Sequence, residues 1–215
     1  MKKTITPTDA PAKRAWQRML SGRRLDLLNP SAADIEIEDI AHGLARVARW
    51  NGQTLGDHAF SVAQHALVVE EITSARNKDW PPRWRLAALL HDAPEYVVGD
   101  LISPFKNAIG LDYKAFELRL LAVIHVRFGL PPELPEDVQA EIKAGDRIAA
   151  FYEATRLAGF AKDEATIFFG DPEGLNSELM NVLQKLMPIQ AEAAQQRFLA
   201  RFHALTDDSR TPASA

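Results

Sequence analysis

The residues with the clearest capacity for chemistry are His91 and Asp92, which directly follow the apolar run Leu86–Leu90. Burying a carboxylate beside such a run costs free energy unless a partner compensates its charge. A divalent cation would do so, because an imidazole donates a nitrogen lone pair and a carboxylate supplies oxygen and charge. The pair also occurs by chance in proteins that bind no metal, so it predicts a metal site only together with further ligands.

Two more residues could complete such a site, and both lie on stretches with helical apolar spacing. His65 lies within Val62–Leu67, and Asp146 lies within Ile142–Ile148. Two imidazoles and two carboxylates form a mixed nitrogen and oxygen site, which suits Mn, Fe, Co, Zn or Mg better than a soft ion. Each residue also has a simpler interpretation, His65 as a core histidine and Asp146 as the ion-pair partner of Arg147.

The stretches that must position these residues are helical in their apolar spacing along most of the chain. Strand signals are weak, although Ile35–Ile37 alternates and Ala165–Phe169 could be extended. Arg23–Pro30 is expected to be a loop, and Ala93–Asn107 mostly turn with one short helix at most. We therefore predict a single all-α domain. Its helices are expected over Ala12–Leu20, Glu38–Arg49, Gly56–Thr73, Leu86–Leu90, Asp112–Phe128, Glu136–Ala158, Leu175–Leu186 and Pro188–Leu205.

The composition is that of an ordinary soluble globular protein, with 215 residues, 47% apolar and 25% charged. There is no cysteine, so we expect neither disulfides nor a thiolate site. The net charge is −4 without a block of like charge, which argues against binding nucleic acid through a basic face. We find no apolar run of membrane-spanning length and no secretory signal after Lys2-Lys3, and so expect a cytoplasmic protein.

The order His65, then His91-Asp92, then Asp146 resembles the HD superfamily of metal-dependent phosphohydrolases. The resemblance is most detailed to the bacterial HD-domain 5′-deoxynucleotidases, and it covers about Arg49 to Glu153. It implies one HD-domain helical bundle of about seven to nine helices over residues 1–215. The motifs would lie in a core over about 38–160. A polar tail is expected over about 206–215. The matching segments are Arg49-Trp50, Gln64–Leu67, His91–Glu95, Gly99–Leu101, Ser103–Lys106, Tyr113–Glu117 and Ile142–Asp146.

The resemblance also implies a reaction and a role for each residue. A water activated by one divalent cation would attack the phosphorus of a (deoxy)nucleoside 5′-monophosphate. Glu95 would orient or deprotonate a water, and Asp100 would supply a proton to the leaving oxygen. The cation would be held by His65, His91, Asp92 and Asp146.

Three further residues are expected to bind the substrate. Arg49 would hold the phosphate as a bidentate clamp and stabilise charge in the transition state. Trp50 would pack against the sugar or base and help to exclude a ribose 2′-hydroxyl, and Lys106 would help to hold the phosphate. The simpler interpretations stay open: a helix-end arginine, a core tryptophan and a solvated lysine. Glu95 and Asp100 likewise have simpler interpretations, as a solvated charge and a turn cap.

Some residues depart from the nucleotidase pattern. Ala66 and Pro94 replace serines, and Gln64 replaces a glutamate. These departures spare the predicted metal ligands but leave the choice of substrate open. His58, seven residues before His65, is a rival first ligand if both lie on one helix, although the neighbours of His65 match the family better.

Three other functions remain open at this stage. They are an HD-type deoxynucleoside triphosphohydrolase, a nucleotide phosphodiesterase and a non-catalytic nucleotide-binding module. We expect a small nucleotide as the partner, neither nucleic acid nor membrane, and, by family analogy alone, a homodimer.

Overall fold

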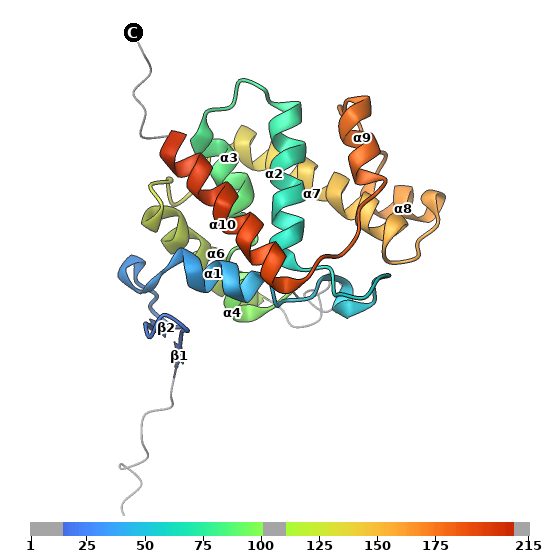
Figure 1. The fold of residues 1–215 in the computed structure, drawn as a ribbon. Coiled ribbons are helices and arrows are strands. Elements are labelled where there is room, and N and C mark those ends of the chain that lie inside the picture. Colours follow the sequence, from blue (N-terminus) through green and yellow to red (C-terminus); the bar gives the residue numbers. More distant parts are fainter. Residues whose placement is uncertain (1–14, 101–110, 209–215) are drawn as a thin grey trace, which may run out of the picture.

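Two long helices, α2 (Val62–Arg76) and α7 (Glu136–Arg156), pack against each other at the centre of the fold (Figure 1). The computed structural model describes residues 15–100 and 111–208 of the chain. The other helical elements are η2 (Ala32–Asp34), α1 (Ile37–Leu44), η3 (Arg49–Gly52), α3 (Pro82–Leu89), α4 (Glu95–Val98), α6 (Leu111–Arg127), α8 (Lys162–Phe169), α9 (Ser177–Leu183) and α10 (Ala191–Asp208).

Helix α2 is the central helix, because α1, α3, α7 and α10 all contact it. It begins at a capped turn, in which Ser61 Oγ accepts a hydrogen bond from the backbone N–H of Gln64 at 3.2 Å. Side chains on several of its faces are buried, including those of His65, Glu70 and Thr73. A polar group on such a helix needs a partner, because water cannot reach it.

The apolar interior consists of two clusters that meet along α2. One packs α1, α3, α6 and α10 against Val62, Ala63 and Ala66. The other packs α7, α8 and α9 against Val69 and Ile72. His65 therefore lies where the two clusters join, on a helix held from both sides.

Gly145 allows the two long helices to approach each other closely. A Cβ added at this position would lie 2.5 Å from Thr73 Cγ2, well inside van der Waals contact. The Thr73 side chain is fixed there, since its hydroxyl donates to the backbone carbonyls of Val69 and Glu70. The absence of a side chain at Gly145 thus sets the distance between α2 and Asp146, the next residue on α7.

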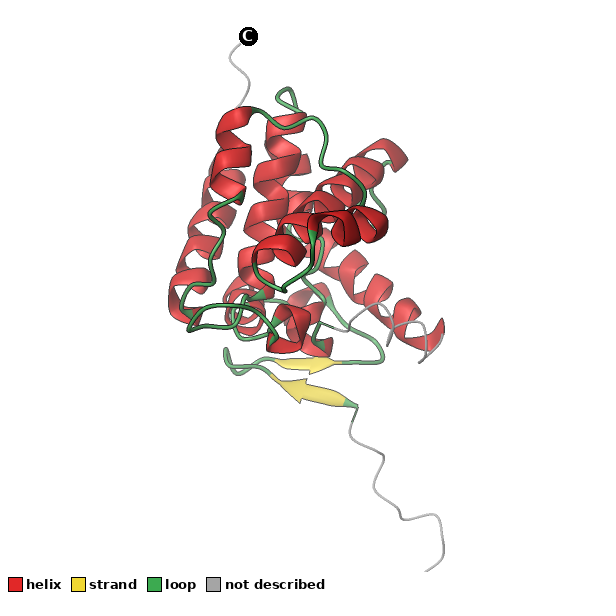
Figure 2. Cartoon of the chain, turned by 90° about the vertical axis from the view of Figure 1, so that its right-hand side faces the viewer, coloured by secondary structure: helices red, strands yellow, loops and turns green. Residues whose placement is uncertain are grey.

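The all-α prediction is confirmed, with one small exception among the described residues. Trp16–Arg18 forms β1, which pairs antiparallel with β2 (Arg24–Asp26) at one end of the bundle (Figure 2). The helix predicted over Ala12–Leu20 is therefore wrong where the structure describes it, and the loop predicted over Arg23–Pro30 contains a strand. Residues 12–14 of that prediction lie outside the described range.

The hairpin forms because a tight turn and a cross-strand contact outweigh the helical spacing. Gly22 takes a φ of 88°, which suits glycine, and the backbone of Met19 bonds both Gly22 and Arg23 across the turn. The guanidinium carbon of Arg24 lies 4.5 Å from the ring centre of Trp16 on the opposite strand.

Two expected extended segments are not strands. Ala165–Phe169 belongs to helix α8, in which Ile167 and Phe168 are exposed, so its apolar run does not mark a buried strand. The alternation at Ile35–Ile37 arises because both isoleucines are buried immediately before and at the start of α1.

Several predicted boundaries shift, and two of the shifts affect the site. Helix α1 ends at Leu44 instead of Arg49, so Arg49 lies in the short element η3. Helix α2 begins at Val62 instead of Gly56. The predicted helices over Leu86–Leu90, Asp112–Phe128, Glu136–Ala158, Leu175–Leu186 and Pro188–Leu205 correspond to α3, α6, α7, α9 and α10.

Within the described residues, no helix combines the length and apolar character needed to cross a membrane.

Candidate metal centre

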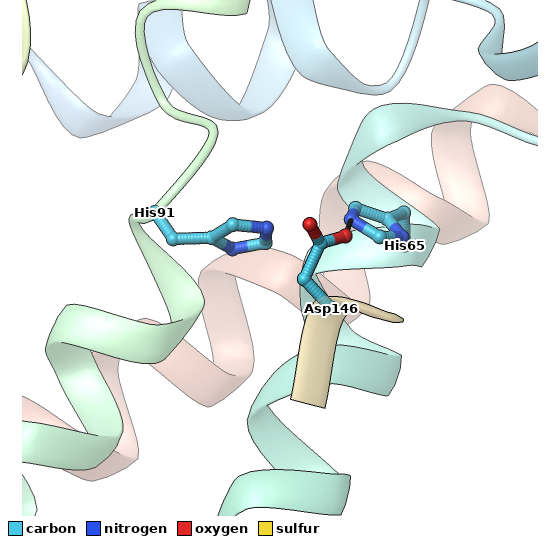
Figure 3. A group of neighbouring side chains, drawn as sticks. All are labelled: His65, His91 and Asp146. Carbon is cyan, nitrogen blue, oxygen red and sulfur yellow. Dashed lines mark ion pairs between the residues drawn. The ribbon is translucent and has the colours of Figure 1, made fainter. Parts of the chain in front are cut away.

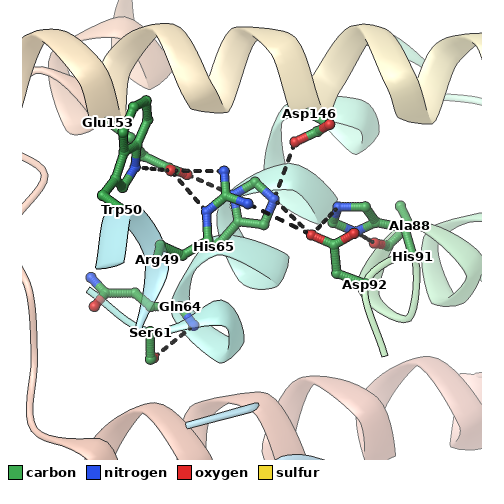
Figure 4. Close-up of polar contacts among 10 residues, drawn as sticks. All are labelled: Arg49, Trp50, Ser61, Gln64, His65, Ala88, His91, Asp92, Asp146 and Glu153. Carbon is green, nitrogen blue, oxygen red and sulfur yellow. Dashed lines mark hydrogen bonds and ion pairs between the residues drawn. The ribbon is translucent and has the colours of Figure 1, made fainter. Parts of the chain in front are cut away.

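Four predicted ligands come together from three parts of the chain; Figure 3 shows His65, His91 and Asp146, and Figure 4 adds Asp92. His65 lies on α2, His91 and Asp92 lie in the turn after α3, and Asp146 lies on α7. The ligand atoms of His65, His91 and Asp146 all lie within 4.8 Å of one another. Asp92 Oδ2 lies 3.4 Å from His65 Nε2 and 3.3 Å from His91 Nε2, while Asp146 Oδ1 lies 3.2 Å from His65 Nε2.

Each imidazole is held by its Nδ1 atom, which leaves Nε2 directed into the cluster. Nδ1 of His65 lies 2.6 Å from Glu153 Oε1, and Nδ1 of His91 lies 2.8 Å from the carbonyl oxygen of Ala88. An acceptor at Nδ1 fixes the hydrogen there and leaves a lone pair on Nε2. Both Nε2 atoms are buried without a hydrogen-bond partner in the described part of the chain. Two such atoms beside two carboxylates fit the donor set of a divalent cation.

The charges around these atoms favour a positive charge between them. Burial would raise the pKa of Asp92, but His91 and His65 hold that pKa well below its usual range. Burial and Arg49 oppose a charge on His65, yet Glu153, Asp146 and Asp92 together raise its pKa well above the usual value. The carboxylates are thus ionised at neutral pH, as ligands of a cation must be.

The cluster is closed on the imidazole side and open on the carboxylate side. The side chain of His65 is fully buried, whereas that of Asp146 is 40% exposed and that of Asp92 is 23% exposed. The carboxylates of Asp92 and Asp146 therefore form the exposed side of the cluster.

Arg49 lies beside this cluster because its segment pairs with the start of α2. The N–H of Arg49 donates to Phe60 O at 2.8 Å, and the N–H of Val62 donates to Val47 O at 3.0 Å. Arg49 Nη1 lies 3.8 Å from Asp92 Oδ2. Burial opposes the charge of Arg49, but Glu153 and three further carboxylates, those of Asp146, Asp92 and Asp100, raise its pKa above the usual value.

Trp50 follows Arg49 and has a backbone conformation that residues other than glycine rarely adopt. Trp50 has a φ of 56° and Asn51 a φ of 51°, both in the left-handed region. The indole N–H of Trp50 donates to Glu153 Oε2 at 2.9 Å, and its ring meets the edges of Phe160 and Phe169 at centroid distances of 5.7 and 6.0 Å. Trp50 is thus anchored at its polar end and packed along its apolar part.

Glu153 is the residue that sequence reasoning missed. It is fully buried on α7, seven residues after Asp146, and it bonds Arg49, Trp50 and His65 at once (Figure 4). A signal was present in the sequence: a lone carboxylate two helical turns beyond a candidate ligand, within the apolar run Ala149–Ala154.

The remaining predicted residues are placed with differing clarity. Glu95 is the first residue of α4, its side chain is 1% exposed, and its N–H donates to Asp92 O at 3.0 Å. Asp100 follows α4 and acts on Arg49 through its charge. His58 is exposed and precedes α2, so the expectation that it shares a helix with His65 is wrong. Lys106 lies outside the described residues.

The departure at Gln64 has a structural explanation. Its side-chain amide donates to Met187 O at 2.7 Å and accepts from the N–H of Ile189 at 3.1 Å. A glutamate carboxylate could accept but not donate, so only the amide satisfies both groups. Gln64 thereby ties the segment before α10 to the first turn of α2.

Known proteins match this chain over the region that contains the site. The family described as 5′-deoxynucleotidase YfbR-like matches residues 42–166, a range that includes every described residue of the site. An uncharacterized protein of Rhodobacter capsulatus is 55% identical over 193 residues, which cover 90% of this chain and 96% of that protein.

Two further relatives are less similar to this chain. The uncharacterized protein YfdR of Escherichia coli is 31% identical over 175 residues, or 81% of this chain and 86% of its own. A 5′-deoxynucleotidase of Cronobacter sakazakii is 27% identical over 172 residues, or 73% of this chain and 83% of its own. The matched family and the Cronobacter enzyme support a hydrolase that acts on nucleotides.

Proposed function

This chain belongs to the YfbR-like 5′-deoxynucleotidase family, and from that premise we propose that it is a metal-dependent phosphohydrolase of (deoxy)nucleoside 5′-monophosphates. One observation carries the proposal: the buried Nε2 atoms of His65 and His91 are unpartnered within the described chain and lie beside ionised carboxylates. A buried polar atom without a partner is costly, and a cation at this place would remove the cost.

His65, His91, Asp92 and Asp146 are the proposed ligands of one divalent cation. Such a cation, when bound, polarises a phosphate oxygen and lowers the pKa of water enough to give a nucleophile near neutral pH. The two nitrogen and two oxygen donors are compatible with Mn, Co, Fe, Zn or Mg. Because the Asp146 side chain is 40% exposed, water and substrate would approach the ligands from its side.

Arg49 is the proposed phosphate-binding residue. Its Nε and Nη2 atoms already donate to Glu153 at 3.1 and 3.0 Å, so the clamp expected from the sequence cannot use that edge of the guanidinium. The Nη1 atom, 3.8 Å from Asp92 Oδ2, points toward the ligand set instead. A phosphate that bridges Arg49 and the metal ligands would gain charge-assisted hydrogen bonds there.

Three other residues complete the proposed reaction. Glu95, buried three residues after Asp92, would orient or deprotonate the attacking water. Asp100, which lies near enough to Arg49 to act on it, would in its protonated form supply the proton to the departing sugar oxygen. Trp50 would pack against the sugar or base, since it is held rigidly beside Arg49.

A metal-by-nucleotide screen tests the proposal. Purified protein, stripped with EDTA and reloaded with Mn or Co, should release inorganic phosphate from deoxynucleoside 5′-monophosphates, and EDTA should stop the release. Release of triphosphate or pyrophosphate from triphosphates would identify a triphosphohydrolase or a related activity instead. Nucleotide binding without any release in the whole panel would contradict an enzyme.

A further inference from the structure

We infer that Glu153 is the positioning residue of this site, orienting His65 toward the metal and Arg49 with Trp50 toward the phosphate. The inference rests on the proposed function, because it specifies how the proposed metal ligands and the proposed phosphate-binding residues are held in position relative to each other.

Both oxygens of the Glu153 carboxylate are bonded by protein donors. Oε1 lies 2.6 Å from His65 Nδ1, and Oε2 accepts from Arg49 Nε, Arg49 Nη2 and Trp50 Nε1 at 3.1, 3.0 and 2.9 Å. Three of these donors lie on Oε2 and one on Oε1, so both oxygens of the carboxylate face protein groups. The side chain is also 0% exposed, and Oε1 contacts the Nδ1 side of His65 rather than the Nε2 side that faces the ligand set, so we place Glu153 outside the metal ligands. Its contribution must pass through the residues that it holds.

The contacts join two elements that approach the site from different directions. His65 comes from α2, whereas Arg49 and Trp50 come from η3 (Figure 4). Glu153 comes from α7, which also supplies Asp146 two turns earlier on the same face. Helix α7 therefore carries one proposed ligand directly and fixes a second ligand and the phosphate-binding residue through a single side chain.

The strained backbone of η3 makes this anchor necessary. Trp50 and Asn51 occupy the left-handed region, where a residue with a side chain persists only if its surroundings hold it. Glu153 bonds the side chains on both sides of the Arg49–Trp50 peptide, so it restrains the chain where that conformation begins. Without it, we expect η3 to relax and Arg49 to leave the ligand set.

Glu153→Gln tests the inference, because it keeps the size of the side chain but replaces one acceptor oxygen with a donor. His65 would lose its oriented lone pair, and metal affinity of the stripped protein should fall about 10- to 100-fold. At saturating metal, KM for the nucleotide should rise by a similar factor, more than kcat falls. The indole ¹⁵N–¹H resonance of Trp50, assigned with Trp50→Phe, should shift.

Glu70→Gln is the matched control. Glu70 is also buried, on α2, and accepts from Arg201 at 2.8 and 2.6 Å and from Ser74 at 2.7 Å, outside the site. This variant should lose stability as Glu153→Gln does, yet keep metal affinity, KM and the Trp50 resonance. Equal metal affinity and equal KM in the two variants would overturn the inference.

Glu153→Asp serves if the glutamine variant fails to fold. It keeps the charge but is one methylene too short to reach Arg49 and His65 together, so the same changes should appear in smaller measure. Wild-type values of both metal affinity and KM in Glu153→Asp would overturn the inference. If the wild-type protein binds metal but releases no phosphate, the proposed function fails, while metal affinity and the Trp50 resonance still decide the role of Glu153.

Discussion

The molecule contains two glutamate–arginine pairs in which the glutamate is buried, Glu70 with Arg201 and Glu153 with Arg49. The first joins α2 to α10, and each oxygen of its carboxylate accepts from the guanidinium. The second joins α7 to η3 and uses one oxygen for Arg49 and the other for His65. Beside the second pair, a buried imidazole nitrogen is left without a partner in the described chain, whereas both oxygens of Glu70 in the first pair accept from Arg201 and one also accepts from Ser74. The first pair therefore joins helices, whereas the pair at the site leaves the Nε2 atom of His65 available to a ligand.

The largest expected effect comes from removing a proposed ligand beside the second pair. Asp92→Ala takes away an ionised oxygen that lies within 3.4 Å of both free Nε2 atoms, so metal binding and phosphate release should be lost together. Metal content by mass spectrometry and phosphate release check this. Full activity in Asp92→Ala would show that the four residues are not the metal site.

Replacing each of the two arginines by alanine tests the comparison between the two pairs. Arg49→Ala should keep the metal but lower kcat/KM about 100- to 1,000-fold, because a charge aimed at the phosphate is gone. Arg201→Ala should leave kcat/KM unchanged and lower the free energy of unfolding by about 1–3 kcal/mol, because Glu70 loses its charged donor. Denaturant unfolding and steady-state kinetics on both variants measure the difference. A loss of turnover in Arg201→Ala equal to that in Arg49→Ala would erase the distinction.

A third prediction concerns the helix spacing on which the second pair depends. Gly145→Ala places a methyl group 2.5 Å from Thr73 Cγ2, so α7 must move away from α2 at a cost of about 1–3 kcal/mol, and metal affinity should fall. Adding Thr73→Ser removes the Cγ2 methyl group of Thr73 but keeps its hydroxyl. The double variant should therefore recover both the free energy of unfolding and the metal affinity. Failure of the double variant to recover would show that the contact does not set the position of Asp146.

The smallest expected effect concerns two buried histidines. Carboxylates raise the pKa of His65, whereas burial lowers the pKa of His125, which is 2% exposed near the end of α6. As pH falls below about 6.5, the unfolded chain takes up a proton at His125 that the folded protein does not, so stability should decrease. The free energy of unfolding, measured between neutral pH and pH 5, should depend less on pH in His125→Gln than in the wild type. An unchanged slope would contradict this assignment.

The sequence was most informative where a residue and its reason lie close together along the chain. His91 and Asp92 stand out beside Leu86–Leu90 because the cost of burying them is visible locally. Helices α6 and α7 are long and regular, so apolar spacing located them well. The meeting of His65, His91 and Asp146 required family resemblance, since spacing alone does not bring separate helices together.

The rest depended on contacts between distant positions. Glu153 gains its role from Arg49 and His65, which precede it by 104 and 88 residues. Contacts at such separations along the chain cannot be predicted from the spacing of apolar residues. The end of α1 at Leu44 depends on the pairing of Val47 with Val62, which was equally invisible. The β1–β2 hairpin differs from the predicted helix because three-residue strands are too short to show alternation.

Anomalous diffraction from crystals soaked in Mn²⁺ tests the central claim most directly, because it locates the ion without relying on activity. The account predicts one strong peak within coordinating distance of His65 Nε2, His91 Nε2 and the carboxylates of Asp92 and Asp146. A peak elsewhere on the molecule, with none between these four side chains, would contradict it.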